Sequence, residues 1–177
     1  MGPLDLLILL MALGVVAFLT YQRMARALFS LAVLWGATML SGFLYEEAAY
    51  RIKAISGPNR SLVEGAMFMG LFTLFFVIGY VIIHVSFPVT NLPKIGFLDN
   101  VMGFLLGLIV AAVIVAVLHN AIGVMVKERW VDQIAWVRMR NSFYASPLQP
   151  FSRTVMNIYG RLFAPFMRPL PSALRPL

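Results

Sequence analysis

Two histidines, His84 and His119, are the side chains within the apolar segments of this chain that could ligate a metal ion, a haem iron or the magnesium of a chlorophyll-type pigment. An ionisable residue inside a membrane segment is a functional candidate by default. If the two segments are antiparallel neighbours, the 1.5 Å rise per residue of a helix separates the rings by roughly 25 Å. One cofactor therefore cannot bind both. We predict no metal and no cofactor, with each histidine bonded to a neighbouring helix or reaching toward an interface, and keep single-histidine ligation of a pigment or haem as the alternative.

Polar residues near the starts of the apolar segments predict helix N-terminal caps. These residues are Asp5, Ser61, Glu64 and Asp99. Ser61 and Glu64 have the three-residue spacing of a capping box, and a carboxylate in a first turn also meets the positive end of the helix dipole. The acids could instead form a proton path, but Asp99 falls on the opposite face of the membrane from the other two. Capping explains them without ion transport.

Motifs of known enzyme classes are missing from the sequence. It holds no G-x-S-x-G, H-E-x-x-H, G-x-x-x-x-G-K-S/T or G-x-G-x-x-G run, and the histidines have no nearby acid in the sequence that could complete a triad. The absence of cysteine excludes disulfides, thiolate metal sites and cysteine nucleophiles. We therefore predict no enzymatic activity and no catalytic residues.

The composition determines which elements carry these residues. The chain of 177 residues is 61% hydrophobic and 12% charged, whereas soluble domains are about 45–50% apolar. Four apolar segments are long enough to cross roughly 30 Å of hydrocarbon. They cover residues 4–20, 27–44, 62–87 and 98–126. We predict an all-α membrane protein with a four-helix transmembrane domain, residues 1–126, and a basic, proline-rich juxtamembrane tail, residues 127–177.

The connections between the first three spans are predicted from their polarity. Because only a few polar residues separate the first two spans, we expect a tight helical hairpin. The polar stretch after the second span predicts a short interfacial helix, closed by a Gly-Pro turn. Its charged residues are Glu46, Glu47, Arg51 and Lys53. Trp35 and Tyr45 are expected at the membrane–water interface.

The tail carries most of the net charge of +7 and predicts contact with anionic lipid headgroups, which contributes about 1 kcal/mol per basic residue. The expected membrane-surface or partner contacts are Lys127, Arg129, Trp130, Trp136, Arg138 and Arg140. One amphipathic helix is expected within residues 127–144. A second, short one is expected to place Val155, Ile158, Tyr159, Leu162 and Phe166 on one face. No recognition motif accompanies the charge, so no nucleic acid is expected.

The distribution of charge predicts the topology. An even number of spans places both termini and the second loop on one side, and basic residues are more numerous there than around Arg23, Arg26 and Lys94. The positive-inside rule then predicts that both termini are cytoplasmic.

A stripe of small residues, Gly103, Gly107 and Ala111, follows one face of the fourth span at four-residue spacing. Small residues let helix backbones approach closely in a membrane. The partner could be the second span, where Ala32, Gly36 and Leu40 repeat the spacing, or another copy of the chain. We expect packing within the chain.

The segment from Gly96 to Gly107, GFLDNVMGFLLG, resembles the G-(W/F)-L-D-x-x-x-G-x-x-x-G start of the last span in the colicin V production protein (CvpA) family. The opening from Leu4 to Ile8, LDLLI, is similar to that family's first residues, and the resemblance covers roughly residues 1–126. The first loop keeps Arg23 and Arg26 but lacks the glycines of the family's R-G-x-x-R-G run. The resemblance implies a bacterial inner-membrane protein linked to toxin production or envelope maintenance, with no catalytic residue.

The two function hypotheses belong to different classes. The first is a non-enzymatic scaffold or accessory subunit that binds other integral membrane proteins of a larger complex, photosynthetic or respiratory, through its spans and tail. The alternative is a small transporter or export accessory protein that works through a homo-oligomeric pore. It predicts that Asp99 or His119 faces water.

Overall fold

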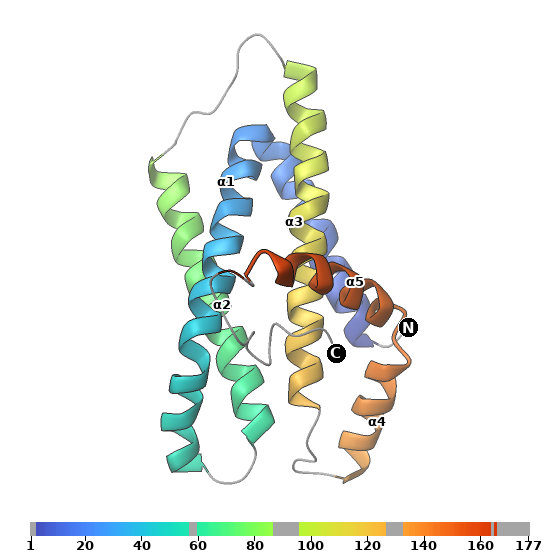
Figure 1. The fold of residues 1–177 in the computed structure, drawn as a ribbon. Helices are drawn as coiled ribbons and strands as arrows, with labels where there is room; N and C mark the ends of the chain where they lie inside the picture. Colours follow the sequence, from blue (N-terminus) through green and yellow to red (C-terminus); the bar gives the residue numbers. More distant parts are fainter. Residues whose placement is uncertain (1–2, 57–59, 87–95, 127–132, 164, 166–177) are drawn as a thin grey trace.

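The computed structural model describes residues 3–56, 60–86, 96–126, 133–163 and 165. Their helices, in chain order, are α1 (Pro3–Ser56), α2 (Arg60–Ser86), α3 (Gly96–Met125), α4 (Gln133–Tyr144) and α5 (Leu148–Arg161) (Figure 1). Four segments are long and apolar enough to cross a membrane: Asp5–Gln22, Met24–Ile52, Ser61–Ser86 and Gly96–Met125. The prediction of an all-α membrane protein with four spans is confirmed.

The long helix α1 doubles back on itself and supplies the first two spans. Ile8 packs beside Val115 of α3, Leu19 lies next to Gly107, and the amide of Met24 reaches Asp99. The first half of α1 thus runs antiparallel to α3. The second half returns along the bundle toward the end at which α2 begins (Figure 1). The contacts therefore agree with the predicted hairpin.

The second span is longer than the sequence indicated. The polar residues Glu47 and Arg51, expected in a separate interfacial helix, belong to the same helix as the span, since α1 continues to Ser56. They form a salt bridge at 3.0 Å with the four-residue spacing that supports a helix. Tyr45 is fully buried and Trp35 packs against the core. Tyr45 is therefore inside the protein instead of being exposed at the interface, and Trp35 is partly buried against the core.

Aromatic rings and two glycines determine how α2 packs. Phe68 stacks on Phe72 and meets Tyr45 of α1 edge to face at 5.6 Å. A Cβ atom on Gly65 would lie 2.9 Å from the carbonyl oxygen of Ala121. A Cβ atom on Gly79 would lie 2.7 Å from a methyl group of Val33. The glycines therefore allow α2 to approach α3 near one end and α1 near the other.

The small-residue stripe of α3 packs within the chain, but its partner differs from the predicted one. Gly103, Gly107 and Ala111 are all buried. A Cβ atom on Gly107 would lie 3.4 Å from the carbonyl oxygen of Val16, which belongs to the first span. A Cβ atom on Gly36 of the second span would meet no atom within 4 Å. The four-residue spacing predicted which face of α3 packs closely, but it did not predict which helix that face contacts.

The two tail helices pack along the bundle. In Figure 1, α4 lies beside the lower end of α3, and α5 crosses α3 near the middle of its length. Pro150 sits in the first turn of α5, where a helix needs no amide hydrogen. Val155, Ile158, Tyr159 and Leu162 share the face predicted for them, because all four line one cavity. Phe166 lies outside the described residues.

Candidate functional site

Buried polar side chains at the lower end of the bundle connect the tail to the spans. His119 of α3 is 1% exposed, and its Nδ1 atom lies 3.0 Å from the hydroxyl of Ser152 in α5. Its ring stacks on Phe143 of α4 with 4.4 Å between the centroids. Within the part of the chain that the structure describes, His119 Nε2 has no hydrogen-bond partner. A single ring of α3 thus contacts both tail helices.

A second contact involves the first residues of the chain. The hydroxyl of Ser146 donates to Asp5 Oδ1 at 2.7 Å and accepts the amide of Leu148 at 3.1 Å. Asp5 and Ser146 are both buried. We name the set Asp5, His119, Ser146 and Ser152 the tail-docking site.

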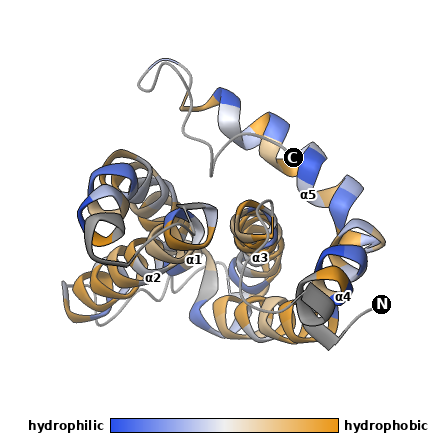
Figure 2. Cartoon of the chain, turned by 90° about the horizontal axis from the view of Figure 1, so that it is seen from below, coloured by the Kyte–Doolittle hydropathy of each residue, from blue (hydrophilic) through white to orange (hydrophobic). Residues whose placement is uncertain are grey.

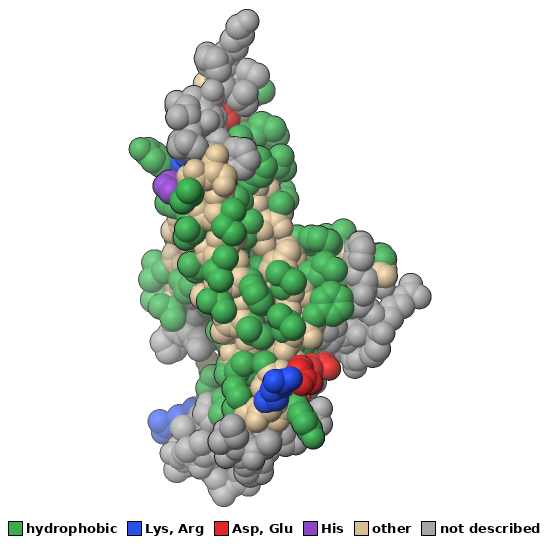
Figure 3. Space-filling model, turned by 90° about the vertical axis from the view of Figure 1, so that its left-hand side faces the viewer, with side chains coloured by type: hydrophobic (Ala, Val, Ile, Leu, Met, Phe, Trp, Pro, Cys, Tyr) green, Lys and Arg blue, Asp and Glu red, His purple; other side chains and the backbone are tan. Residues whose placement is uncertain are grey.

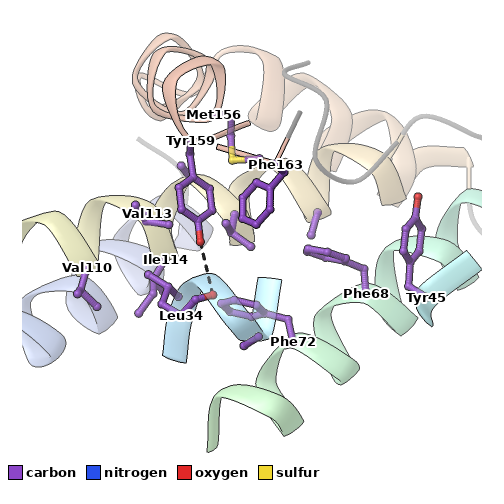
Figure 4. Close-up of a cluster of buried hydrophobic side chains, with 14 of the residues drawn as sticks. Leu34, Tyr45, Phe68, Phe72, Val110, Val113, Ile114, Met156, Tyr159 and Phe163 are labelled. Carbon is purple, nitrogen blue, oxygen red and sulfur yellow. Dashed lines mark hydrogen bonds between the residues drawn. The ribbon is translucent and has the colours of Figure 1, made fainter. Parts of the chain in front are cut away.

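A third contact lies at the other end of α5. The hydroxyl of Tyr159 donates to the carbonyl oxygen of Leu34 at 3.5 Å (Figure 4) and lies 3.1 Å from the hydroxyl of Thr38. Burial raises the pKa of the Tyr159 phenol above its usual value, against a smaller opposing effect of its bond to Thr38. Phe163 stacks on Trp35 at 5.8 Å. α5 is therefore fixed to α3 at its start and to α1 at its end.

Under α5 lies an apolar cavity of about 600 Å³. Its walls come from the second half of α1, from α3 and from α5. The lining residues are Leu28, Leu31, Ala32, Trp35, Ile109, Ala112, Val113, Val155, Ile158, Tyr159 and Leu162. None of these side chains is charged, so the cavity suits hydrocarbon.

The residues that line the cavity show how deep α5 lies relative to the spans. Asp99 and Asn120 are the buried polar residues nearest the two ends of α3, and Ile109 lies about ten residues, or roughly 15 Å, from each. Because Ile109 and Leu162 line the same cavity, the end of α5 lies near the middle of the span. Its start, at Ser152, is level with His119. α5 therefore slopes from the edge of the apolar zone to its centre instead of lying at the headgroups.

The exposed surface of α5 carries a hydrophilic stripe beside the exposed apolar residues Phe151, Ile158 and Leu162. Arg153, Asn157 and Arg161 are exposed, and their four-residue spacing places them on one stripe of the helix. Figure 2 shows hydrophilic residues along α5, whereas the spans are mostly hydrophobic. An arginine at the centre of a bilayer costs about 2.5–3.5 kcal/mol on insertion scales. This polar stripe is therefore unfavourable against lipid and requires water or protein beside it.

The opposite end of the bundle has its own polar contacts, at the turn of the hairpin. The amide of Met24 donates to Asp99 Oδ1 at 2.9 Å, and Asp99 is 2% exposed. The side chain of Gln22 donates to the hydroxyl of Tyr80 in α2. One carboxylate at the start of α3 thus holds the backbone of α1 where the chain reverses.

The other predicted site residues fall in several places. His84 is exposed and stacks on Tyr80 at 6.3 Å, near the end of α2, whereas His119 lies near the end of α3 at the opposite end of the bundle (Figure 1). Arg138 and Arg140 are exposed on α4. Lys127, Arg129, Trp130 and the side chain of Trp136 lie outside the described residues. Pigment or haem ligation by a histidine stays a prediction, as do the four helix caps.

The hydroxyl groups of the site were not among the residues predicted from the sequence. Thr38, Ser146 and Ser152 are buried donors or acceptors between distant segments. Serine and threonine are common in loops and helices alike, so their types gave no signal. A weak signal was available for Ser152, because it falls on the apolar side of an amphipathic helix.

Together, the four apolar spans and the buried polar contacts at both ends define a multi-pass α-helical membrane protein. Residues 4–153 match the family described as Colicin V production protein. The chain belongs to this family, as the GFLD segment and the opening LDLLI segment predicted. No curated protein and no solved structure matches it.

Proposed function

We propose that this chain is a non-enzymatic accessory subunit of the bacterial inner membrane that assembles with further membrane-protein subunits through α5. The polar stripe of α5 carries the proposal. Arg153, Asn157 and Arg161 are exposed at depths where the spans meet hydrocarbon, and a neighbouring subunit would shield them from lipid. The contacts at both ends of α5 support a fixed position, so the stripe is presented in one orientation.

The test is the mass of the protein extracted with its surrounding lipid. We expect particles with a protein mass well above the 19.7 kDa of one chain. Replacing Arg153, Asn157 and Arg161 together by leucine should release single chains, because an apolar α5 is stable in lipid. Leu74→Val, an exposed position of α2, serves as the matched control and should leave the mass unchanged. A wild-type protein that runs as single chains would contradict the proposal.

A second candidate, an export accessory protein, is favoured by the slope of α5. A polar stripe that leads from the edge of the apolar zone to its centre is suited to guiding a polar solute, and the family's link to colicin V production supports a role near export. A passage through a single copy would require Asp99 or His119 to face water. Both are buried inside the protein, so a passage within one copy is not part of the candidate.

The orientation of the chain belongs to the same proposal, with both termini in the cytoplasm. The chain has no cysteine, so single cysteines report topology directly. We expect Asn141→Cys, on α4, to react with a membrane-impermeant maleimide only after the inner membrane of spheroplasts is opened. Ser86→Cys, at the end of α2, should react in intact spheroplasts. The reverse pattern would place the termini outside.

A further inference from the structure

The cavity between α5 and the spans lies at a depth where hydrocarbon surrounds the protein. Its lining residues on α3 are near the middle of that helix, and Figure 3 shows hydrophobic side chains over the middle of the bundle, with charged ones toward its ends. We infer that this cavity binds one acyl chain of an anionic phospholipid from the leaflet on the α4 side. The inference goes beyond the proposed assembly and does not depend on it, because the polar stripe of α5 takes no part in the cavity.

The chemistry of the cavity walls excludes water. The lining side chains contribute two polar groups, the hydroxyl of Tyr159 and the indole N–H of Trp35. The hydroxyl already contacts Leu34 and Thr38 inside the bundle. A buried water molecule needs about two to four polar partners, more than the indole alone can supply. The cavity therefore suits an apolar ligand.

The volume of the cavity fits a lipid chain. An apolar cavity of about 150 Å³ takes up one benzene molecule. The cavity here, at about 600 Å³, therefore has room for roughly 20 carbon atoms at a similar density. Leaving so large a space empty would cost about as much free energy as the whole net stability of a typical domain. In a membrane, lipid chains are the apolar molecules at hand to fill it.

The cavity is open toward the membrane. Leu28 of α1, Ile109 of α3 and Ile158 of α5 all line it, and they are 51%, 50% and 66% exposed. Each of the three walls thus contributes a half-exposed apolar residue to the rim. A chain from the surrounding lipid can enter there without passing a polar group.

An apolar stripe of α5 leads from the edge of the apolar zone to this rim. Phe151, Ile158 and Leu162 are exposed and, with Val155, follow one side of the helix, about a third of a turn away from the polar stripe. From Phe151 to Leu162 the stripe is about 16 Å long, roughly the depth of one leaflet. An acyl chain that follows it reaches the cavity from the α4 side.

The charge of the tail helices favours an anionic headgroup. α4 and α5 hold four arginines and no aspartate or glutamate. Arg138 and Arg140 are exposed on α4, about one turn before Phe143, which stacks on His119 near the end of α3. The two arginines therefore lie close to where headgroups begin. Basic side chains at this depth attract anionic lipids, so the charge favours a phosphatidylglycerol over a zwitterionic lipid.

Trp35 in the cavity wall can report occupancy directly. In the full-length chain, Trp130→Phe and Trp136→Phe leave it as the single tryptophan. This parent protein is placed in phosphatidylcholine vesicles that contain a small fraction of phosphatidylglycerol with brominated acyl chains, because bromine quenches tryptophan fluorescence on contact. We expect half-maximal quenching at a mole fraction roughly tenfold lower than with brominated phosphatidylcholine, given the attraction to nearby arginines.

Variants that fill the cavity test its position. Ala32→Phe and Ala112→Phe each place a ring in it, from α1 and from α3. Either should reduce quenching to the level set by the bulk fraction of brominated lipid, so one variant suffices if the other folds poorly. Ala17→Phe, at an exposed position of the first span, is the matched control and should be quenched like the parent.

The headgroup is tested by Arg138→Gln together with Arg140→Gln, which should remove the preference for the anionic lipid. Arg51→Gln, at an exposed position of α1, is the charge control and should keep that preference. Equal quenching of the parent by both lipids would overturn the assignment of an anionic lipid. Quenching that follows only the bulk fraction, or that persists in the cavity-filling variants, would overturn the site itself. No quenching by either lipid would mean that a protein segment fills the cavity and would likewise overturn the inference.

Discussion

The two ends of the bundle use buried carboxylates in different ways. At the upper end Asp99 accepts a backbone amide, that of Met24, whereas at the lower end Asp5 accepts a side-chain hydroxyl, that of Ser146. A backbone donor is present whatever residue occupies position 24, but the hydroxyl exists only because position 146 is serine. The hairpin turn should therefore tolerate substitution of its donor residue, and the tail-docking site should not.

The largest effect is expected from removal of the acceptor at the hairpin. Asp99→Leu leaves the Met24 amide without its buried partner, and an unsatisfied group bonded to a charge costs about 2–3 kcal/mol. We expect a clear fall in the thermal midpoint of the detergent-solubilised protein. The midpoint is measured by size-exclusion chromatography of samples heated to a series of temperatures. Asp99→Asn keeps an oxygen acceptor and should lose about half as much. Equal losses in the two variants would show that the charge, and not the hydrogen bond, is what matters.

At the tail-docking site the corresponding change is Ser146→Ala. It leaves Asp5 without one donor and the amide of Leu148 without its acceptor, at a cost of about 1–2 kcal/mol. Because α4 and α5 meet at this position, we expect faster proteolysis between the two helices and an unchanged thermal midpoint of the spans. Ser142→Ala, at an exposed position of α4, is the matched control. Protease resistance equal to that of the wild type would show that the tail does not depend on this contact.

A smaller effect of the same kind is expected at His119. Ser152→Ala removes a neutral hydrogen bond to the ring, worth about 0.5–1.5 kcal/mol, while Phe143 continues to stack on it. Fluorescence of a dye on Asn157→Cys should show greater mobility of α5. Thr154→Ala, which removes a hydroxyl that donates to the carbonyl oxygen of Pro150 within α5, should leave that mobility as it was.

The smallest effect is expected from the donor residue of the hairpin turn. Met24→Ala retains the amide that Asp99 accepts, so we expect a loss below about 1 kcal/mol from packing of the half-buried side chain. The measurement is the same thermal midpoint as for Asp99→Leu. A loss as large as that of Asp99→Leu would mean that the side chain of Met24 holds the turn.

The sequence was most informative where periodicity or length carries the signal. Charge-free segments predicted four spans because a bilayer demands about 20 apolar residues per helix, and the repeat of Val155, Ile158, Tyr159 and Leu162 predicted one face of α5. The same amphipathic pattern fits a helix on headgroups and a helix against a bundle, so it did not predict where α5 lies. The end of the second span was misplaced because charged residues at a helix end look like a loop.

The polar contacts could not be predicted for a different reason. The bond from Ser146 to Asp5 joins residues 141 positions apart, and no local spacing relates them. The two glycine positions illustrate the same limit, since Gly107 and Gly36 follow similar patterns in the sequence but only Gly107 has a close neighbour. Local patterns define which face of a helix is small or polar, and the tertiary fold selects what that face meets.

The bond between Met24 and Asp99 also has a consequence for synthesis of the chain. The acceptor lies 75 residues after the donor, and chains grow at about 5–20 residues per second. The first two spans must therefore stay in the membrane for roughly 4–15 s before the carboxylate that secures their turn has been made. During that interval the turn depends on other contacts or on the insertion machinery, so a ribosome pause between α2 and α3 would extend the most vulnerable stage of its biogenesis.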